Sequence, residues 1–395
     1  MILLGDYAPG EHPVNMEQFS DVTILVNLEG PVIPLGNNYF PLTKAGPTLG
    51  HKFLPDGARV KKPKRIIYSV ANNHSMDYGW SALEQTLHLI HERNEFALGA
   101  GDTRQQARKP LIIEENHKRI GILACCERQF GIAEYDLPGC AAMGDWLYPA
   151  IAELKRDVDY VIVSCHAAVE NSPWPSPFLR DFYRSLADCG ADIIHGHHAH
   201  VPQPVEFYKK SIIAYGLGNF VVPHADWGTT PNALWSIGLK IEFCDGKMQH
   251  EKVYIENIYD KASSTLIPAV SSDERKYAQY EDDINHVMHD DSVFLSVWHE
   301  VALLCYDIYC EKYLFQDINT SMKENIFKKI LDNLSSRNTK NYRDLMLSYV
   351  MVACESHRGI IETAMAILTK VTKNLQSAYS KQIVRKYMGY LYDRI

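Results

Sequence analysis

Short apolar runs rich in Val, Ile and Leu recur along the first two-thirds of the chain, and each stops at a polar cluster. The five clearest runs are Met1–Leu4, Val22–Val26, Ile66–Val70, Tyr160–Ser164 and Ala191–Ile194. Runs of this length and composition are typical of β-strands that are buried on both faces. Stretches with helical spacing alternate with them, at Trp80–Arg93, Asp145–Arg156 and Pro177–Cys189. This alternation predicts an α/β fold.

The polar residues that follow these runs are of the types that bind metal ions. They are Asp6, Asn27, Glu29, Asn72, Asn73, His74, Asp77, His166, Glu170, His197, His198 and His200. Loops that leave the carboxyl ends of strands in an open α/β sheet share one rim, so we expect these side chains to converge. Neutral imidazole is the commonest side-chain ligand of first-row transition metals, and carboxylates complement it. The sequence therefore predicts a metal site, the alternative being histidines with only surface or core roles.

The order of these motifs resembles that of a known family. The motifs are Gly5-Asp6, Asn27-Leu28-Glu29-Gly30, Ala71-Asn72-Asn73-His74, His166 with Glu170, Gly196–Val201 and Tyr215–Phe220. The series resembles the bacterial capsule-synthesis family (CapA-like, poly-γ-glutamate), which is itself similar to the calcineurin-like metallophosphoesterases. The resemblance covers residues 1 to 260 and implies a metallophosphoesterase-like α-β-β-α sandwich. It also implies two divalent metal ions, of Mn, Fe or Zn.

The resemblance implies a role for each motif residue. Asp6, Glu29 and Asn73 would be oxygen ligands; His166 and one or more of His197, His198 and His200 would be nitrogen ligands. His74 would act as general acid or orient the phosphate, which makes His74, Asp6 and Asn73 the catalytic set. The residues expected around the ligands or the substrate are Asn27, Asn72, Asp77, Glu170, Glu206 and Asn219. For Glu170 and Glu206, an ordinary solvated carboxylate is an equal alternative.

The chain also departs from the phosphoesterase pattern. Asp6 is followed by Tyr7-Ala8, where those enzymes carry Asp-x-His, and the second motif is Asn-Leu-Glu in place of Gly-Asp-x-x-Asp. These differences preserve metal-binding residue types but leave the number of metals, and hence hydrolytic competence, open.

Composition narrows the class of protein. A formal charge of −8 over 395 residues argues against a general nucleic-acid binder. Nine cysteines without CxxC spacing indicate reduced thiols and a cytoplasmic location. We expect no membrane span, because no apolar run approaches ~18 residues.

The pattern changes near residue 260. Ala233–Ile255 predicts a hairpin around Asp245-Gly246, and Ser271–Asp273 predicts a helix N-cap cluster. Helical spacing then dominates, with apolar faces at Val293, Val297, Val301 and Leu304; at Ile326, Ile330 and Leu334; and at Ile360, Ala364, Ile367 and Val371. We expect a first domain over residues 1–262 and a helical domain over 270–395, which could cover the site, bind a synthesis-complex partner or form a homodimer.

Together these features predict a metal-dependent, phosphoesterase-like hydrolase that acts in cell-surface polymer synthesis or remodelling. Its substrate would be a small-molecule or polymeric anion. Two alternatives stay open: a non-catalytic metal-binding component of a polymer-synthesis complex, and an amide-forming or amide-transferring enzyme on the same scaffold.

Overall fold

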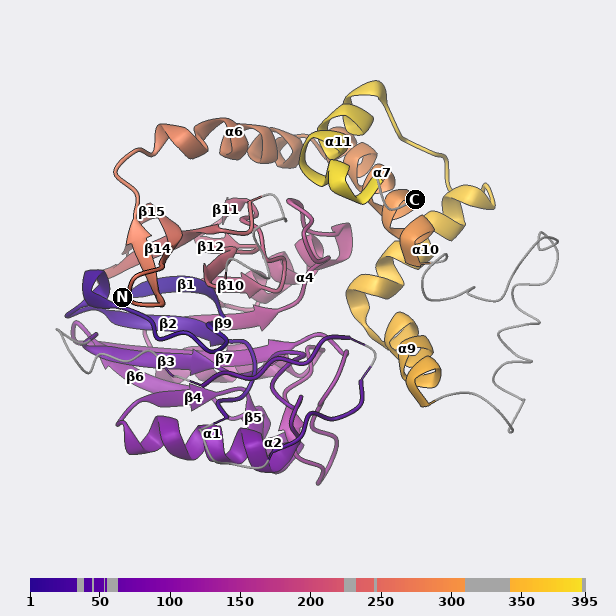
Figure 1. The fold of residues 1–395 in the computed structure, drawn as a ribbon. Helices are drawn as coiled ribbons and strands as arrows, with labels where there is room; N and C mark the ends of the chain where they lie inside the picture. The colour runs from indigo at the N-terminus through magenta and orange to yellow at the C-terminus, as the bar shows by residue number, and fades with distance from the viewer. Residues whose placement is uncertain are drawn as a thin grey trace.

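Two β-sheets face one another in this protein, with helices on their outer faces and a further group of helices at one edge (Figure 1). The computed structural model describes residues 1–33, 39–44, 46–52, 54, 63–223, 232–244, 247–309 and 342–392.

The first sheet has the strand order β16-β15-β14-β1-β2-β3-β4, and β13 pairs with β1. Its strands are β1 (Ile2–Tyr7), β2 (Thr23–Leu28), β3 (Arg65–Ser69), β4 (Phe96–Leu98), β13 (Asn219–Val221), β14 (Trp235–Cys244), β15 (Lys247–Asp260) and β16 (Thr265–Val270). Strands β1 to β4 are parallel, whereas β14 to β16 form an antiparallel extension. The predicted hairpin is therefore confirmed as β14 and β15, while its turn at 245–246 lies outside the described residues.

The second sheet has the order β11-β12-β10-β9-β7-β6. Its strands are β6 (Leu111–Glu115), β7 (Lys118–Cys126), β9 (Tyr160–His166), β10 (Ile193–His197), β11 (Val205–Tyr208) and β12 (Ser211–Ala214). Strands β7, β9, β10 and β12 are parallel. A small separate pair consists of β5 (Ala100–Gly101) and β8 (Gly139–Cys140).

Alternate residues of the central strands enter different cores, which explains why these strands read as continuous apolar runs. In the first sheet, Leu3, Leu25 and Ile67 face the second sheet. Their neighbours Leu4 and Val26 face the opposite side. That side is covered by α1 (Trp80–Glu92), while α3 (Leu147–Asp157) and α4 (Pro177–Asp188) cover the outside of the second sheet. The predicted α-β-β-α sandwich is confirmed. Two short helices, η1 (Glu17–Phe19) and α2 (Arg104–Ala107), lie in the connections.

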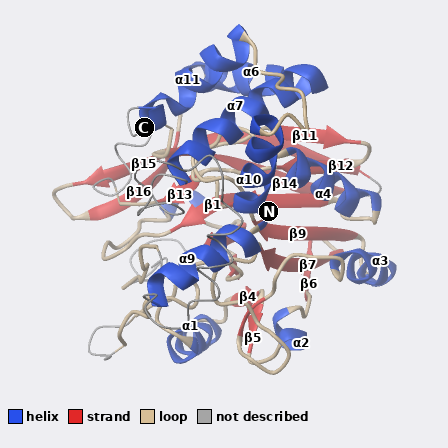
Figure 2. Cartoon of the chain, turned by 90° about the vertical axis from the view of Figure 1, so that its right-hand side faces the viewer, coloured by secondary structure: helices blue, strands red, loops and turns tan. Residues whose placement is uncertain are grey.

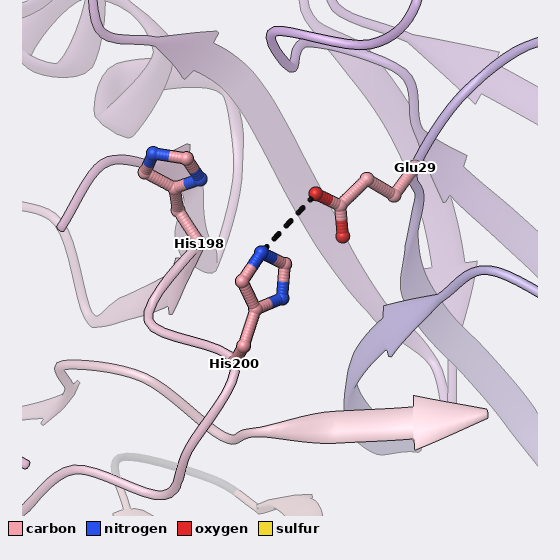
Figure 3. Close-up of side chains that lie close together, drawn as sticks. All are labelled: Glu29, His198 and His200. Atoms are coloured by element: carbon pink, nitrogen blue, oxygen red, sulfur yellow. Dashed lines mark ion pairs between the residues drawn. The ribbon is translucent and has the colours of Figure 1, made fainter. Parts of the chain in front are cut away.

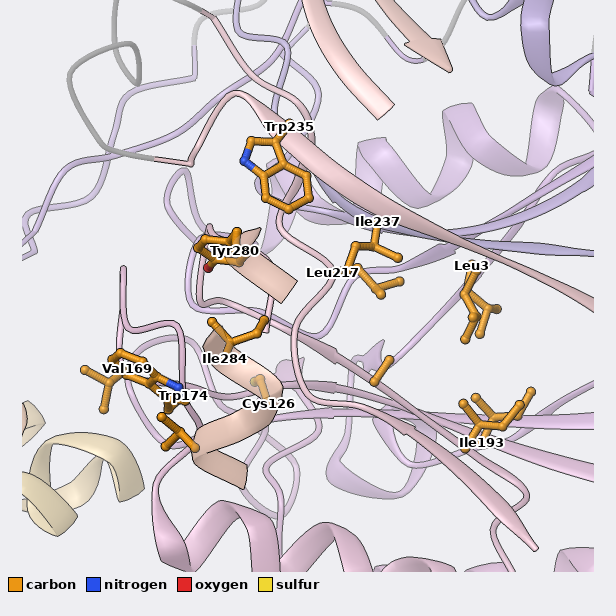
Figure 4. Close-up of a cluster of buried hydrophobic side chains, with 14 of the residues drawn as sticks. Leu3, Cys126, Val169, Trp174, Ile193, Leu217, Trp235, Ile237, Tyr280 and Ile284 are labelled. Carbon is orange, nitrogen blue, oxygen red and sulfur yellow. The ribbon is translucent and has the colours of Figure 1, made fainter. Parts of the chain in front are cut away.

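The C-terminal part is helical, as predicted. Its described helices are α6 (Arg275–His289), α7 (Asp291–Tyr309), α9 (Tyr342–Ala353), α10 (Glu355–Leu368) and α11 (Ala378–Tyr392). Tyr280 and Ile284 of α6 join the buried cluster that contains Trp235 and Trp174, so these helices share a core with the sheets (Figure 4). In the second view, α9 and α10 lie in front of the sheets (Figure 2).

Three details of the helical region differ from, or lie beyond, the predictions. Residue Glu274, and not the Ser271–Asp273 cluster, precedes the first turn of α6. Val371 lies past the end of α10 and is 82% exposed, because the helix stops at Leu368. The face at residues 326–334 falls outside the described residues. Within the described part, none of the helices has the length and apolarity needed to cross a membrane. The boundaries at 262 and 270 stay a prediction, and β16 lies between residue 262 and residue 270.

Candidate metal centre

Residues far apart in sequence meet at one edge of the sandwich. The convergence involves two sheets and not the single rim predicted from the sequence: β1, β2 and β3 belong to the first sheet, β9 and β10 to the second. Asp6 lies inside β1, and His166 and His197 are the last residues of β9 and β10. Glu29 and Asn73 follow β2 and β3, and all five side chains are buried.

Two glycines allow the backbone to approach closely here. A Cβ atom at Gly5 would lie 1.8 Å from the carbonyl oxygen of Gly218, and one at Gly196 would lie 1.9 Å from that of Tyr215. Any side chain at these positions would therefore push neighbouring strands apart. The glycines beside Asp6 and His197 are thus a requirement of the strand packing that forms the site.

Glu29, His198 and His200 form the core of the candidate centre (Figure 3). One ligand atom from each lies within 4.8 Å of the others, and His200 Nε2 is 3.6 Å from Glu29 Oε1. Both histidines have left-handed backbone angles, with φ of 81° at His198 and 59° at His200. Such angles are uncommon for residues other than glycine and occur at functional sites.

Unpartnered polar atoms show that this group fits a cation. Among the described residues, both carboxylate oxygens of Glu29 and the Nδ1 atom of His198 are buried without a hydrogen-bond partner. Burial raises the pKa of Glu29 well above its usual range, and the nearby charges of Asp6 and Glu170 raise it further. A buried carboxylate without donors is costly, and a divalent cation is the partner that removes this cost. The mixture of oxygen and imidazole donors suits Mn, Fe or Zn.

Asp6 adjoins this group and is held by several donors. Its Oδ1 atom accepts a hydrogen bond from Asn27 Nδ2 at 2.8 Å and lies 3.1 Å from His197 Nδ1. Its Oδ2 atom accepts from the backbone N–H of His198 at 3.2 Å and lies 3.6 Å from His200 Nδ1. Burial alone would raise the pKa of Asp6, but its contacts with His197, His200 and Asn27 together outweigh burial and lower the pKa. Asp6 is therefore a carboxylate in the folded protein.

His166 and Asn73 complete the neighbourhood. His166 Nε2 lies 2.9 Å from Asn73 Oδ1 and 3.9 Å from Glu29 Oε1. Burial holds the pKa of His166 well below its usual range, so its ring is neutral, as metal ligation requires. His166 Nδ1 also lies 4.0 Å from Asp6 Oδ1, and its ring centroid is 4.5 Å from that of His198. The structure thus brings Asn73 and His166 together beside Glu29, Asp6 and His198.

The three candidate histidines of the Gly196–His200 segment have different surroundings. Both ring nitrogens of His197 face protein groups: Nδ1 faces Asp6, and Nε2 lies 3.2 Å from Ser164 Oγ. His198 and His200 face Glu29 instead. The nearness of Glu29 therefore favours His198 and His200 as ligands, while His197 lies beside Asp6 with its Nδ1 atom making no hydrogen bond among the described residues.

His74 lies beside Asn73 in a buried charged group. Its Nδ1 atom is 2.7 Å from Asp77 Oδ2 and 3.0 Å from Lys44 Nζ. Lys44 also lies 2.5 Å from Asp77 Oδ1 and donates to the carbonyl of Asn73 at 3.2 Å. Burial lowers the pKa of His74 to about 4, so the ring is neutral at pH 7. Both contacts use Nδ1, which leaves Nε2 for a substrate oxygen.

The other predicted residues divide into two groups. Asn27, Asn72 and Asn219 join the site: Asn72 Nδ2 donates to Asn27 Oδ1 at 3.0 Å, and Asn219 Oδ1 lies 3.1 Å from His200 Nδ1. Glu170 is half-exposed and lies 3.9 Å from His198 Nε2. Glu206 was expected near the imidazoles but contacts Arg184 at 2.7 Å and Tyr215 Oη at 2.6 Å, because β11 is the edge strand beside α4.

Sequence reasoning missed three polar residues of this region. Glu127, at the end of β7, lies 3.1 Å from His198 Nε2, a contact that lowers the pKa of the carboxyl although burial alone would raise it. The sequence could have predicted Glu127, since the apolar run Ile120–Cys126 also stops at a polar residue. Lys44 and His51 belong to a segment without periodic pattern, and nothing in the sequence marks them. His51 Nε2 lies 2.6 Å from the carbonyl of Glu29.

Two curated proteins from Bacillus are similar to this chain. The chain is 33% identical over 186 residues to the PGA biosynthesis protein CapA of Bacillus subtilis (strain 168), covering 46% of this chain and 49% of that protein. It is 32% identical over 182 residues to the capsule biosynthesis protein CapA of Bacillus anthracis, covering 44% of each. The chain thus spans about half the length of the curated relatives it matches.

A solved structure that matches the chain is that of a novel phosphatase of Mycoplasma pneumoniae. It has 16% sequence identity and a TM-score of 0.37, and covers 70% of this chain and 95% of that one. Residues 16–224 match the family described as bacterial capsule synthesis protein PGA_cap. Because this match spans more than half of the 395 residues, the chain belongs to the bacterial capsule synthesis protein PGA_cap family.

Proposed function

We propose that this protein is a metal-dependent phosphoesterase-like hydrolase that acts in the synthesis or remodelling of a capsule-type or poly-γ-glutamate-type polymer. The observation that carries the proposal is the buried group of Glu29, His198 and His200, in which both carboxylate oxygens of Glu29 and the Nδ1 atom of His198 have no hydrogen-bond partner among the described residues. The relatives named for PGA and capsule biosynthesis support the biological setting.

The ligands proposed are Glu29, His198 and His200, with Asp6, Asn73 and His166 beside them. The chemistry that divalent ions supply in such a centre is Lewis-acid polarisation of a phosphoryl oxygen. One ion fits the central group of three; the adjoining residues would hold a second. The proposed substrate is an anion, because a divalent ion in such a centre binds phosphoryl oxygens.

His74 is the proposed proton donor or orienting group for the leaving oxygen. Asp77 and Lys44 contact its ring at Nδ1 and leave Nε2 as the atom that meets the substrate. The neutral ring carries its proton on Nε2 when Nδ1 accepts from Lys44 Nζ; when Nδ1 donates to Asp77, Nε2 can only accept and orient. A positioned acid–base side chain of this kind contributes about 10²–10⁴ in rate. His74 is not among the three residues of the central group, so its removal should affect turnover more than metal binding.

The test uses the full chain, Mn²⁺, and two generic substrates: p-nitrophenyl phosphate and bis-p-nitrophenyl phosphate. We expect turnover that falls about 10²–10⁴-fold in His74→Gln, while Mn²⁺ affinity is kept. We expect His200→Ala to lose both Mn²⁺ binding and turnover. His117→Gln is the matched control, because His117 is 99% exposed and should behave as the wild type.

Turnover that is equal in the wild type and His74→Gln would contradict the assigned role of His74. Tight Mn²⁺ binding without turnover on either substrate would contradict the hydrolase proposal. That second result would favour a non-catalytic metal-binding component of a polymer-synthesis complex.

A further inference from the structure

The C-terminal helices contact residues that adjoin the candidate metal centre. The start of α10 packs against the residues that follow β7, and the contacts run in both directions. Glu127 Oε2 accepts a hydrogen bond from the backbone N–H of Ser356 at 3.1 Å. Glu355 in turn accepts from the backbone N–H of Arg128 at 2.8 Å and from its guanidinium at 2.7 Å. Residues 127–128 are thus fixed by the first turn of α10.

The other oxygen of Glu127 faces the metal site. Glu127 Oε1 lies 3.1 Å from His198 Nε2 and accepts from Gln129 Nε2 at 3.0 Å. An ionised carboxylate only accepts hydrogen bonds, so the proton between the two groups belongs to His198 Nε2. Gln129 Nε2 also lies 2.9 Å from His198 Nε2, and in this tautomer it donates to Glu127 Oε1 and not to the ring. That tautomer leaves the lone pair on Nδ1, the ring atom that is buried without a partner among the described residues.

We propose that Glu127 is a positioning residue that holds His198 in its metal-binding tautomer, and that α10 holds Glu127. The arrangement of carboxylate, histidine and metal recurs in metal sites, where the outer carboxylate fixes the ring and raises its basicity. Here that carboxylate also accepts from a helix N-terminus, where the partial positive charge favours an anion. The inference rests on the metal site of the proposed function but not on hydrolysis.

The placement gives the C-terminal helices a role in the site. The family match ends at residue 224, and α10 begins at Glu355, well outside it. His357, two residues further along α10, interacts electrostatically with Glu127, Glu170 and His198. The helical region therefore forms one wall of the metal centre.

The experiment measures Mn²⁺ affinity of the full chain by isothermal titration calorimetry, together with the unfolding temperature of each metal-free variant. Removing an outer partner of a ligand costs about 10–100-fold in metal affinity. We expect a loss near tenfold for Glu127→Gln, which keeps the shape and the acceptor for Ser356, and near 100-fold for Glu127→Ala. Glu355→Ala, which touches no ligand, should weaken binding toward the lower end of that range.

Glu362→Ala is the matched control on the same helix, since Glu362 is 71% exposed and lies 3.9 Å from Arg358. It should bind Mn²⁺ as the wild type does. The inference is overturned if folded Glu127→Gln and Glu355→Ala both keep wild-type affinity, or if the wild type binds no Mn²⁺. Wild-type Mn²⁺ binding that responds to Glu127, without turnover, supports the inference while the hydrolase proposal fails.

Discussion

Without metal, the Glu29→Gln variant should be more stable than the wild type. With metal added, the variant should be less stable than the wild type. Without metal, the Glu29 carboxylate is buried with no hydrogen-bond donor among the described residues, near Asp6 and Glu170. Its pKa is raised in the folded protein. Between the unfolded pKa of 4.5 and the raised folded value, the folded state therefore binds more protons than the unfolded state. Stability falls as pH rises through that window.

The magnitude follows from the two costs involved. An unsatisfied buried group costs about 1–3 kcal/mol, and more when it is charged, so metal-free Glu29→Gln should gain about that much at pH 8. Mn²⁺ at 100 times its dissociation constant adds about 2.7 kcal/mol to the wild type. The variant lacks the carboxylate ligand and should lose most of this gain. The order of stability should therefore reverse on adding metal.

The assay is urea unfolding at pH 5 and pH 8, with EDTA or with excess Mn²⁺. At pH 5 without metal the advantage of the variant should shrink, because wild-type Glu29 then retains its proton. Glu206→Gln is the control: its partners are Arg184 and Tyr215, so its Mn²⁺-induced gain should equal that of the wild type. A metal-free Glu29→Gln that is less stable than wild type at pH 8, or that keeps the full Mn²⁺ gain, would refute the reasoning.

Three further predictions concern the surroundings of the centre. Burial lowers the pKa of His51 to about 4, so the stability that its neutral ring contributes is lost as pH falls from 6.5 toward 4. The free energy of unfolding falls by about 3 kcal/mol at most over this pH range. In urea unfolding, the free energy of His51→Gln should fall less between pH 6.5 and pH 4 than that of the wild type, and an equal fall would count against this prediction. Asp77→Ala leaves the buried Lys44 without its carboxylate partner and should lower the free energy of unfolding in urea by about 3–5 kcal/mol. The stabilisation by Mn²⁺ should be retained. A loss below about 1 kcal/mol would be inconsistent with a buried ion pair. Gly5→Ala places a methyl group 1.8 Å from the Gly218 carbonyl and should lower both the unfolding temperature and Mn²⁺ affinity, and wild-type values for both would rule out the close approach.

Much of the fold was predictable because one rule, apolar runs that end in polar residues, identifies buried parallel strands. This rule predicts the strands β1, β2, β3, β9 and β10 and identifies the polar side chains at their ends. It could not assign these strands to two sheets, because the same alternation suits a single open sheet. Nor could it find Lys44 and His51, whose positions depend on tertiary contacts with His74 and Glu29 and not on any local period.

The choice among neighbouring histidines also required the structure, for a reason that the backbone makes clear. A regular strand would alternate His197, His198 and the next residues between its two faces. The chain instead leaves β10 at His197 and takes left-handed angles at His198 and His200. These angles turn both rings toward Glu29 and leave His197 with Asp6. The left-handed backbone therefore brings His198 and His200, and not His197, to Glu29, where we propose that the cation binds. The contact of Glu127 with His198 supports Nδ1 as the nitrogen that would bind it.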